Sequence, residues 1–144
     1  MTDPAGPTAE MIAAAARIAR FMRTRADADL AGAFAEDAGG VTIIENFAPH
    51  VFAGPAAVAD WACGFRAHAR DLHDLDWRFG AAQDFRTDGT RAFFTLPTEW
   101  TGRAGARRFA EQGGWAFVLV RQADGWRVAA YAWAVTAFRW VGPE

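Results

Sequence analysis

Two glutamates are the residues of this 144-residue chain whose setting best suits acid–base chemistry. Glu45 falls on the apolar face of an alternating stretch, 41–47, and a carboxylate among apolar neighbours costs free energy unless it is paired, protonated or in use. Glu111 lies between Phe109 and Gly113 on the inward face of a second alternating stretch. Two carboxyls in different environments can divide general acid and general base work, so this pair is the leading catalytic candidate.

Both carboxyls also have purely structural interpretations. Glu45 could reach water at the end of its strand or form an ion pair with an arginine, and Glu111 could pair with Arg107 or Arg108 at a sheet edge. His50 lies in the loop after the first strand, where it could titrate near neutral pH and act as an acid or a base. The alternative for His50 is an ordinary residue of a surface loop.

Several other kinds of chemistry are excluded by composition. The chain contains no serine and no lysine, which rules out a serine nucleophile, a Schiff-base lysine and a phosphate-loop lysine. Cys63 is the single cysteine, and the histidines and aspartates of 68–76 do not have metal-ligand spacing. The net charge of −2 gives no basic surplus for nucleic acid or an anionic membrane. We therefore expect no metal, no cofactor, no nucleic acid and no membrane partner.

The elements that must position the glutamates follow from hydrophobic spacing. Helical spacing predicts three helices, the first beginning near Ala9 after a Thr8 cap and the others over 27–36 and 55–72. Alternation predicts a strand over 41–47, a loop over 48–54, and four long strands over 77–86, 90–101, 107–122 and 126–140. Helices first and strands last indicate an α+β fold, with helices on one face of a curved, mostly antiparallel sheet. The chain shows no linker, so we expect a single domain, 1–144, with a flexible tail over 1–7.

Turn positions then predict which side chains share a sheet face. A turn at 122–125 with uninterrupted pairing puts Phe117 opposite Ala130 and Trp115 opposite Ala132, so that small residues lie inward. In the neighbouring hairpin, a turn at 102–105 puts Phe109 beside Trp100 on the same inward face. The outward residues are then Tyr131, Trp133 and Glu99, and exposed aromatic residues on a sheet predict a homodimer through that face.

Three segments of the chain resemble the nuclear-transport-factor-two-like superfamily, which includes ketosteroid isomerases and SnoaL-like polyketide cyclases. They are Phe34-Ala35-Glu36-Asp37-Ala38, the stretch from Val41 to Trp61, and the closing Gly125-Trp126-Arg127-Val128. The resemblance implies a cone: a strongly bent sheet wrapped around three N-terminal helices, with a pocket at the open end. It also implies homodimers through the outer sheet face.

The resemblance to ketosteroid isomerases also implies roles for individual residues. Glu45 takes the position of the general base, and Glu111 lies near the position of a second, protonated acid. The third member, a tyrosine on the first helix, is replaced by Phe21. Phenylalanine cannot donate a hydrogen bond, so the oxyanion hole of a true ketosteroid isomerase is incomplete here.

These observations predict a pocket protein for a small apolar molecule. It would be a cofactor-free isomerase, cyclase or dehydratase acting on an apolar cyclic substrate, or else a non-catalytic binding or dimerisation module of the same fold. The expected catalytic residues are Glu45, Glu111 and His50, and the expected ligand-binding residues are Phe21, Trp61, Phe65, Thr98, Trp100, Trp115 and Ala132. The polar start of the chain has no apolar signal core, and no run approaches the roughly 20 apolar residues of a membrane span, so we expect a cytoplasmic protein.

Overall fold

A computed structural model of the protein describes residues 6–142, so that residues 1–5 of the expected tail lie outside the described part of the chain. The elements run, in order, α1 (Ala9–Thr24), the 3-10 turn η1 (Asp27–Leu30), β1 (Val41–Ile44), β2 (Val51–Gly54), α2 (Ala57–His68), β3 (Leu72–Phe79), β4 (Gln83–Thr87), β5 (Arg91–Ala104), β6 (Arg107–Gln122) and β7 (Gly125–Val141). No helix within residues 6–142 is long and apolar enough to cross a membrane.

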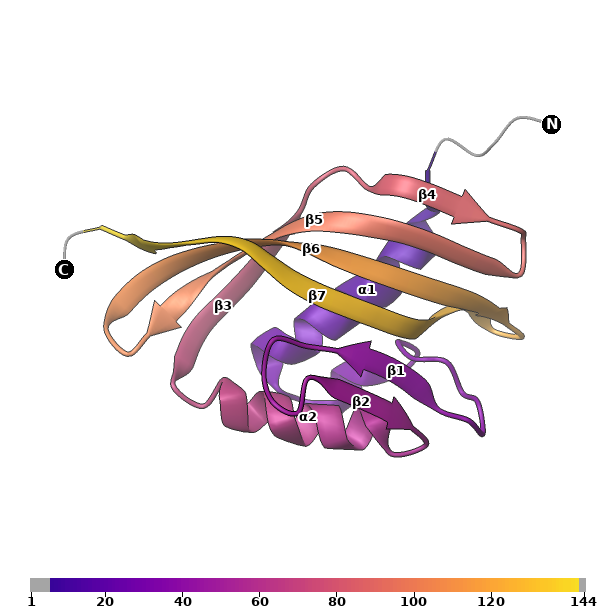
Figure 1. The fold of residues 1–144 in the computed structure, drawn as a ribbon, viewed down its shortest axis with the longest axis horizontal. Coiled ribbons are helices and arrows are strands. Elements are labelled where there is room, and N and C mark those ends of the chain that lie inside the picture. Colours follow the sequence, from indigo (N-terminus) through magenta and orange to yellow (C-terminus); the bar gives the residue numbers. More distant parts are fainter. Residues whose placement is uncertain (1–5, 143–144) are drawn as a thin grey trace.

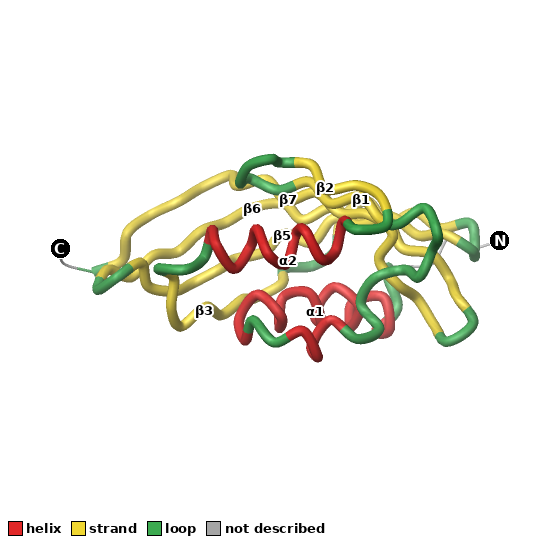
Figure 2. Tube along the Cα trace, turned by 90° about the horizontal axis from the view of Figure 1, so that it is seen from below, coloured by secondary structure: helices red, strands yellow, loops and turns green. Residues whose placement is uncertain are grey.

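One seven-stranded sheet organises these elements. Its strand order is β2-β1-β7-β6-β5-β3, with β4 paired to β5 beside β3. The pairing of β1 with β7 is parallel, and the other pairings are antiparallel. The sheet curls, and both α-helices lie on the same side of it (Figures 1 and 2). The α+β class and the bent, mostly antiparallel sheet are therefore confirmed.

The first helix forms where its sequence predicts. The Thr8 hydroxyl accepts a hydrogen bond from the Met11 N–H at 3.3 Å, which satisfies one of the free donors of the first turn. Ile18 and Phe21 are fully buried on the face that packs against the sheet. The helix ends at Thr24, and the capping residue Arg25 adopts a left-handed conformation with φ of 60°.

The expectation of three N-terminal helices is not confirmed, because 27–36 forms one 3-10 turn in place of a helix. Gly32 has a φ of 76°, which ends the turn. Beyond it, the Ala35 N–H donates to the Val128 carbonyl and the Val128 N–H donates to the Ala33 carbonyl. Phe34 thereby forms a bridge to the last strand. Pairing with β7 has overridden the local preference for helix.

Two strands also differ from expectation. The loop predicted over 48–54 contains β2, which pairs with β1 in a short hairpin. The single strand predicted over 77–86 is two strands, β3 and β4, separated by 80–82, and both pair with the long strand β5. The expected third helix ends at His68; residues 69–71 form a turn, and Leu72 begins β3.

The β5–β6 hairpin shows the predicted faces with a different register. Trp100 lies opposite Glu111, and Gly102 lies opposite Phe109, two residues away from the predicted partners. The turn is tighter than expected, since Ala104 already pairs with Arg107. Because side chains alternate with a period of two, a shift of two residues leaves every side chain on its predicted face.

The β6–β7 hairpin is different, because a bulge after Val128 corrects the prediction for β7. The pairing begins as predicted, with Arg121 opposite Trp126, but Leu119 then pairs with Val128 and Val118 with Ala130. One extra residue on β7 reverses the side-chain faces from Ala130 to Val135, and a second extra residue, Thr136, restores the predicted faces from Ala137 onward. Tyr131 and Trp133 are therefore buried inside the cone, at 3% and 9% exposure, and are not available for the outer dimer face as predicted.

Ala132 changes face with them. It pairs with Ala116 on one side and with Ile44 on the other, and Ile44 is an exposed residue. Ala132 thus belongs to the outer face of the sheet, and its expected place in the pocket is wrong. Glu99 does lie on that outer face, where it accepts hydrogen bonds from Arg78 and Gln112.

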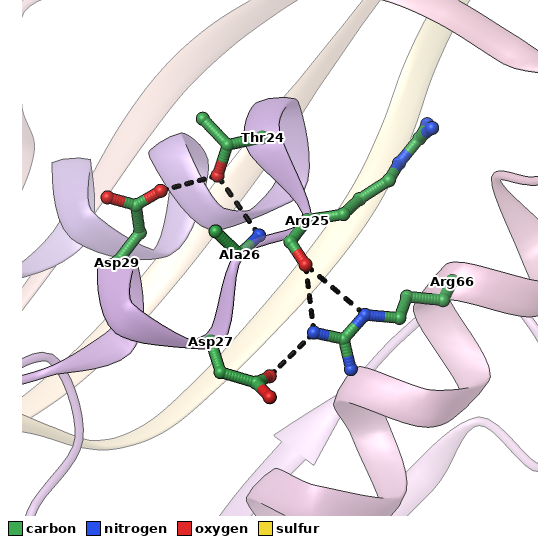
Figure 3. A network of polar contacts seen from close by, with 6 residues as sticks. All are labelled: Thr24, Arg25, Ala26, Asp27, Asp29 and Arg66. Carbon is green, nitrogen blue, oxygen red and sulfur yellow. Dashed lines mark hydrogen bonds and ion pairs between the residues drawn. The ribbon is translucent and has the colours of Figure 1, made fainter.

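Two arginines join the C-terminal ends of α1 and α2 (Figure 3). The Arg25 guanidinium donates to the carbonyls of Ala69 and Leu72 at 3.0 and 2.9 Å. In return, Arg66 on α2 donates to the Arg25 carbonyl at 2.8 Å and to Asp27 at 2.6 Å. These bonds fix the helix ends to each other and to the start of β3.

We expect Arg25→Ala to lower the free energy of unfolding by about 1–3 kcal/mol, because two carbonyl acceptors lose a charged donor. Chemical denaturation monitored by circular dichroism measures the change. Arg20→Ala, at an exposed position of the same helix, is the matched control. Equal effects of the two substitutions would contradict a specific role for the Arg25 bonds.

Candidate functional site

A pocket of about 80 Å³ opens between the helices and the curled sheet. Its apolar walls come from both helices and four strands, and include Met22, Phe65, Leu75, Trp100, Phe109 and Trp133. The polar side chains Glu45, Glu111 and His68 also line it. For scale, an engineered cavity of about 150 Å³ encloses one benzene molecule. The pocket therefore encloses only part of a ring-sized ligand, next to two carboxyls.

Glu45 is the most deeply buried of the polar side chains in the pocket, with 5% of its surface exposed. The Trp61 indole N–H on α2 donates to its Oε2 atom at 3.0 Å. The Tyr131 hydroxyl on β7 donates to the same oxygen at 2.5 Å. Two neutral side-chain donors from different elements therefore hold one carboxyl oxygen of a residue that lines the pocket.

Burial raises the pKa of Glu45 above its ordinary value, because desolvation disfavours the charged form. The hydrogen bonds from Tyr131, from Trp61 and from the Asn46 backbone N–H oppose that rise, and the nearby Glu111 carboxylate adds slightly to it. No arginine of residues 6–142 is among the groups that shift the pKa of Glu45. Of the interpretations open from the sequence, the structure thus favours a pocket carboxyl over an ion pair or a solvated strand end.

Glu111 occupies a shallower position in the same pocket. It is half-buried on β6, with Trp100 of β5 and Phe138 of β7 as its register neighbours. Burial raises the pKa of Glu111 as well, and a side-chain hydrogen bond with Trp133 opposes the rise. The two glutamates therefore differ in depth and in partners, which is the condition for dividing acid and base roles.

His68 is a pocket residue that the sequence analysis did not select. It lies at the C-terminal end of α2, and its ring stacks on Phe47 with centroids 4.8 Å apart. Partial burial lowers the pKa of His68 below its ordinary value, which favours the neutral imidazole near pH 7. The sequence analysis considers this histidine only as a metal ligand, and its stacking on Phe47 has no local sequence signal.

Three of the seven predicted ligand-binding residues line the pocket, namely Phe65, Trp100 and Trp115. Phe21 and Trp61 are fully buried behind it, where their rings pack at a centroid distance of 5.2 Å. Thr98 is buried on the inner sheet face and donates to the Leu96 carbonyl at 3.0 Å, away from the pocket wall. Ala132 lies on the outer face, as described above.

His50 does not line the pocket, in contrast to the predicted catalytic position. It is exposed and lies in the turn that joins β1 to β2, with a φ of 72°. Its Nδ1 atom is 3.0 Å from the backbone carbonyl oxygen of Glu45, and its own carbonyl accepts from the Glu45 N–H. His50 therefore fastens the turn beside Glu45 and stays away from the pocket interior.

Tyr131 and Trp133 were missed for a different reason. Regular pairing from the correctly predicted turn puts both residues on the outer face, because nothing in the sequence of this hairpin indicates the bulge in β7. The missing signal is the engagement of Val128 by residues 33–35, a contact between distant parts of the chain. Among residues 6–142 no cluster of three or more histidine, cysteine, aspartate or glutamate side chains could hold a metal ion.

No family model and no curated protein matches the sequence. Solved structures do match the fold. A protein called Kfla4162 from Kribbella flavida aligns at a TM-score of 0.74 and 19% identity, over 91% of each chain. A type 2 hexachlorocyclohexane dehydrochlorinase, LinA, aligns at 0.76 and 10%, over 93% of this chain and 88% of the other. A proposed dehydratase of the NTF2-like family from Streptomyces avermitilis aligns at 0.70 and 14%, over 89% and 94%.

These likenesses establish that the protein has the NTF2-like fold that the sequence segments suggested. Sequence identities of 10–19% show a shared fold only, and the chemistry of the site depends on the residues present in it.

The raised pKa of Glu45 predicts a pH-dependent gain in stability for Glu45→Gln. A carboxyl whose pKa is higher in the folded than in the unfolded protein stabilises the fold below its ordinary pKa, and this contribution is lost as pH rises through the raised value. Glutamine keeps the acceptor oxygen for Tyr131 and Trp61 without a charge. The melting temperature of Glu45→Gln relative to wild type should therefore be higher at pH 8 than at pH 4.

Thermal melts at both pH values measure this difference, with Glu99→Gln on the outer sheet face as the control. A melting-temperature difference between Glu45→Gln and wild type that is the same at pH 4 and pH 8 would show that burial does not perturb Glu45.

Proposed function

We propose that this protein binds a small, mostly apolar molecule and transfers a proton to or from it without a cofactor, with Glu45 as the base. The observation that carries the proposal is the Glu45 carboxyl itself, which is buried, bordered by a pocket and held by two neutral donors. A structural carboxylate at this depth would be expected to have a cationic partner.

The hydrogen bonds divide the two oxygens of this carboxyl. Trp61 and Tyr131 both donate to Oε2, and the other donor to the carboxyl among the described residues is the backbone N–H of Asn46. Tyr131 retains its proton throughout the neutral range, because burial raises the pKa of the phenol well above 10.0. In this proposal Oε1, which no described side chain holds, takes the proton from a substrate carbon, while Oε2 remains anchored.

Elimination is the reaction class that these residues support best. Glu45 removes a proton from carbon, a double bond forms, and the leaving group departs from the adjacent atom. A protonated Glu111, or water polarised by His68, supplies the proton that the leaving group needs. A dehydrochlorinase and a proposed dehydratase among the similar folds support this reaction class. Elimination also does not require the tyrosine hydroxyl of ketosteroid isomerases, whose position Phe21 occupies here. Isomerase and cyclase chemistry would use the same proton transfer.

The alternative is a binding module of the same fold that performs no chemistry. The buried ring of Phe21, at the position where the resemblance implies a hydroxyl donor, favours it. The two functions differ in whether replacing Glu45 removes a reaction or only modifies binding.

The Kemp elimination of 5-nitrobenzisoxazole tests the base directly. A base removes the C3 proton, the N–O bond breaks, and a coloured nitrophenolate forms, with no cofactor required. We expect wild-type protein to accelerate this reaction and Glu45→Gln to reduce the protein-dependent rate about a hundredfold or more. The wild-type rate should rise with pH around a midpoint above 4.5, the ordinary carboxyl value, because the ionised form is the base.

Glu99→Gln, which removes a carboxylate from the outer face, is the matched control and should keep the wild-type rate. An unchanged rate in Glu45→Gln, or an equal loss in both variants, would favour the non-catalytic alternative.

We also propose that two copies associate through the outer face of the sheet, with residues other than those first predicted. Ile44 and Val51 are register partners there, and 44% and 54% of their surfaces are exposed. Ala132 and Ala116 continue the face with small side chains, which allow a close approach of two sheets. Exposed apolar residues on a contiguous sheet face favour a self-complementary contact.

Ile44→Arg should convert dimers to monomers at micromolar concentration, because a charge would be desolvated in the contact. Light scattering after size-exclusion chromatography measures the mass. Arg91→Ala, at an exposed position near the far end of β5, is the control. A wild-type protein that is monomeric at all concentrations would rule out this association.

A further inference from the structure

The end of β7 carries two exposed aromatic side chains on the same sheet face as the pocket. Phe138 and Trp140 are 49% and 43% exposed, and their rings meet edge to face with centroids 5.1 Å apart. Figure 1 shows this part of β7 extending past the C-terminal end of α2, so that neither helix covers it. We call Phe138 and Trp140 the aromatic patch.

The aromatic patch is continuous with the pocket. Phe109 lines the pocket, and its ring stacks on Phe138 at 5.8 Å with an interplanar angle of 17°. Phe138 is also the register partner of Glu111, and Trp140 is the partner of Phe109. A line of side chains therefore runs from the pocket carboxyl Glu111 across Phe138 to Trp140.

The rings of the patch are held in place from both sides. Phe109 supports Phe138 from the pocket, and the Arg107 guanidinium lies 4.1 Å from the centroid of the Trp140 ring. An arginine over an indole face is a favourable cation–π contact. The patch is thus a preformed apolar surface, which lowers the entropy cost of binding to it.

The volume of the pocket limits how much of a ligand it can enclose. About 80 Å³ encloses a polar end group and part of one ring, and the remainder of a larger ligand must lie outside. The continuous apolar route outward leads over Phe109 to Phe138. Self-association, as proposed above, would use the opposite face of the sheet and would leave this patch open.

We infer that the ligand has a flat apolar body of two or more rings, with its oxygen-bearing end at Glu45 and Glu111 and its far end on Phe138 and Trp140. Offset stacking on these rings makes the patch the determinant of specificity for ligand length. This inference rests on the proposed function, because it extends the same pocket.

Two probes with the same polar end test it, phenol and 4-phenylphenol, titrated by isothermal calorimetry. Wild-type protein should bind 4-phenylphenol at least about tenfold more tightly than phenol, because the second ring reaches the patch. Phe138→Ala and Trp140→Ala should each weaken 4-phenylphenol binding by about three- to tenfold, leaving phenol binding unchanged. Phe93→Ala on the outer face of β5 is the control and should change neither affinity.

Trp140→Ala keeps the stack of Phe109 on Phe138, so it tests the patch even if Phe138→Ala unfolds the protein. Equal affinities for the two probes, or equal losses for both probes in the variants, would overturn the inference. A change of molecular mass in Trp140→Ala would also overturn it, because the patch would then be a contact between copies. Length selection without Kemp elimination would overturn the proposed chemistry alone, and elimination without length selection would overturn the patch alone.

Discussion

The hydrogen bonds to a single oxygen of Glu45 join the three parts of the molecule on which the site depends. Glu45 follows β1, Trp61 comes from α2 and Tyr131 from β7, so the hairpin, the helix and the sheet meet at one carboxyl. Neutral donors satisfy the oxygen without neutralising its charge, and desolvation therefore keeps the pKa of Glu45 raised. A cation at the same place would stabilise the charged form and remove its basicity.

In contrast to the two glutamates, the arginines lie outside the pocket. Arg66 and Arg25 bind carbonyls and Asp27 around the helix ends, and Arg127 on β7 pairs with Glu36 and Asp124 at the surface. The positive charges of these residues thus hold the framework together outside the pocket. The pocket retains acids of raised pKa among aromatic walls, which is the arrangement in which a carboxyl can exchange protons near neutral pH.

Much of this arrangement could be predicted from local sequence. The alternation of apolar and polar residues predicts that Glu45 and Glu111 face inward. This prediction is correct for Glu111 even though the pairing of β5 with β6 differs from the predicted register by two residues. Helical spacing and the Thr8 cap located α1. The features that local sequence did not predict depend on distant contacts: the loss of helix after Leu30, the bulge beside Val128, and the stacking of His68 on Phe47. In each case a partner more than twenty residues away in the chain decides the local geometry.

The bulge after Val128 decides which side chains of β7 point into the cone. Residues 130–134 alternate alanine with aromatic side chains, so one of these two sets must face inward. The extra residue, Ala129, lets Val128 and Tyr131 both face inward, because Val118 pairs with Ala130. If the same residues paired without the bulge, the alanines would lie inside and Tyr131 and Trp133 outside. The hydrogen bond that anchors Glu45 therefore depends on a backbone irregularity as well as on the tyrosine that donates it.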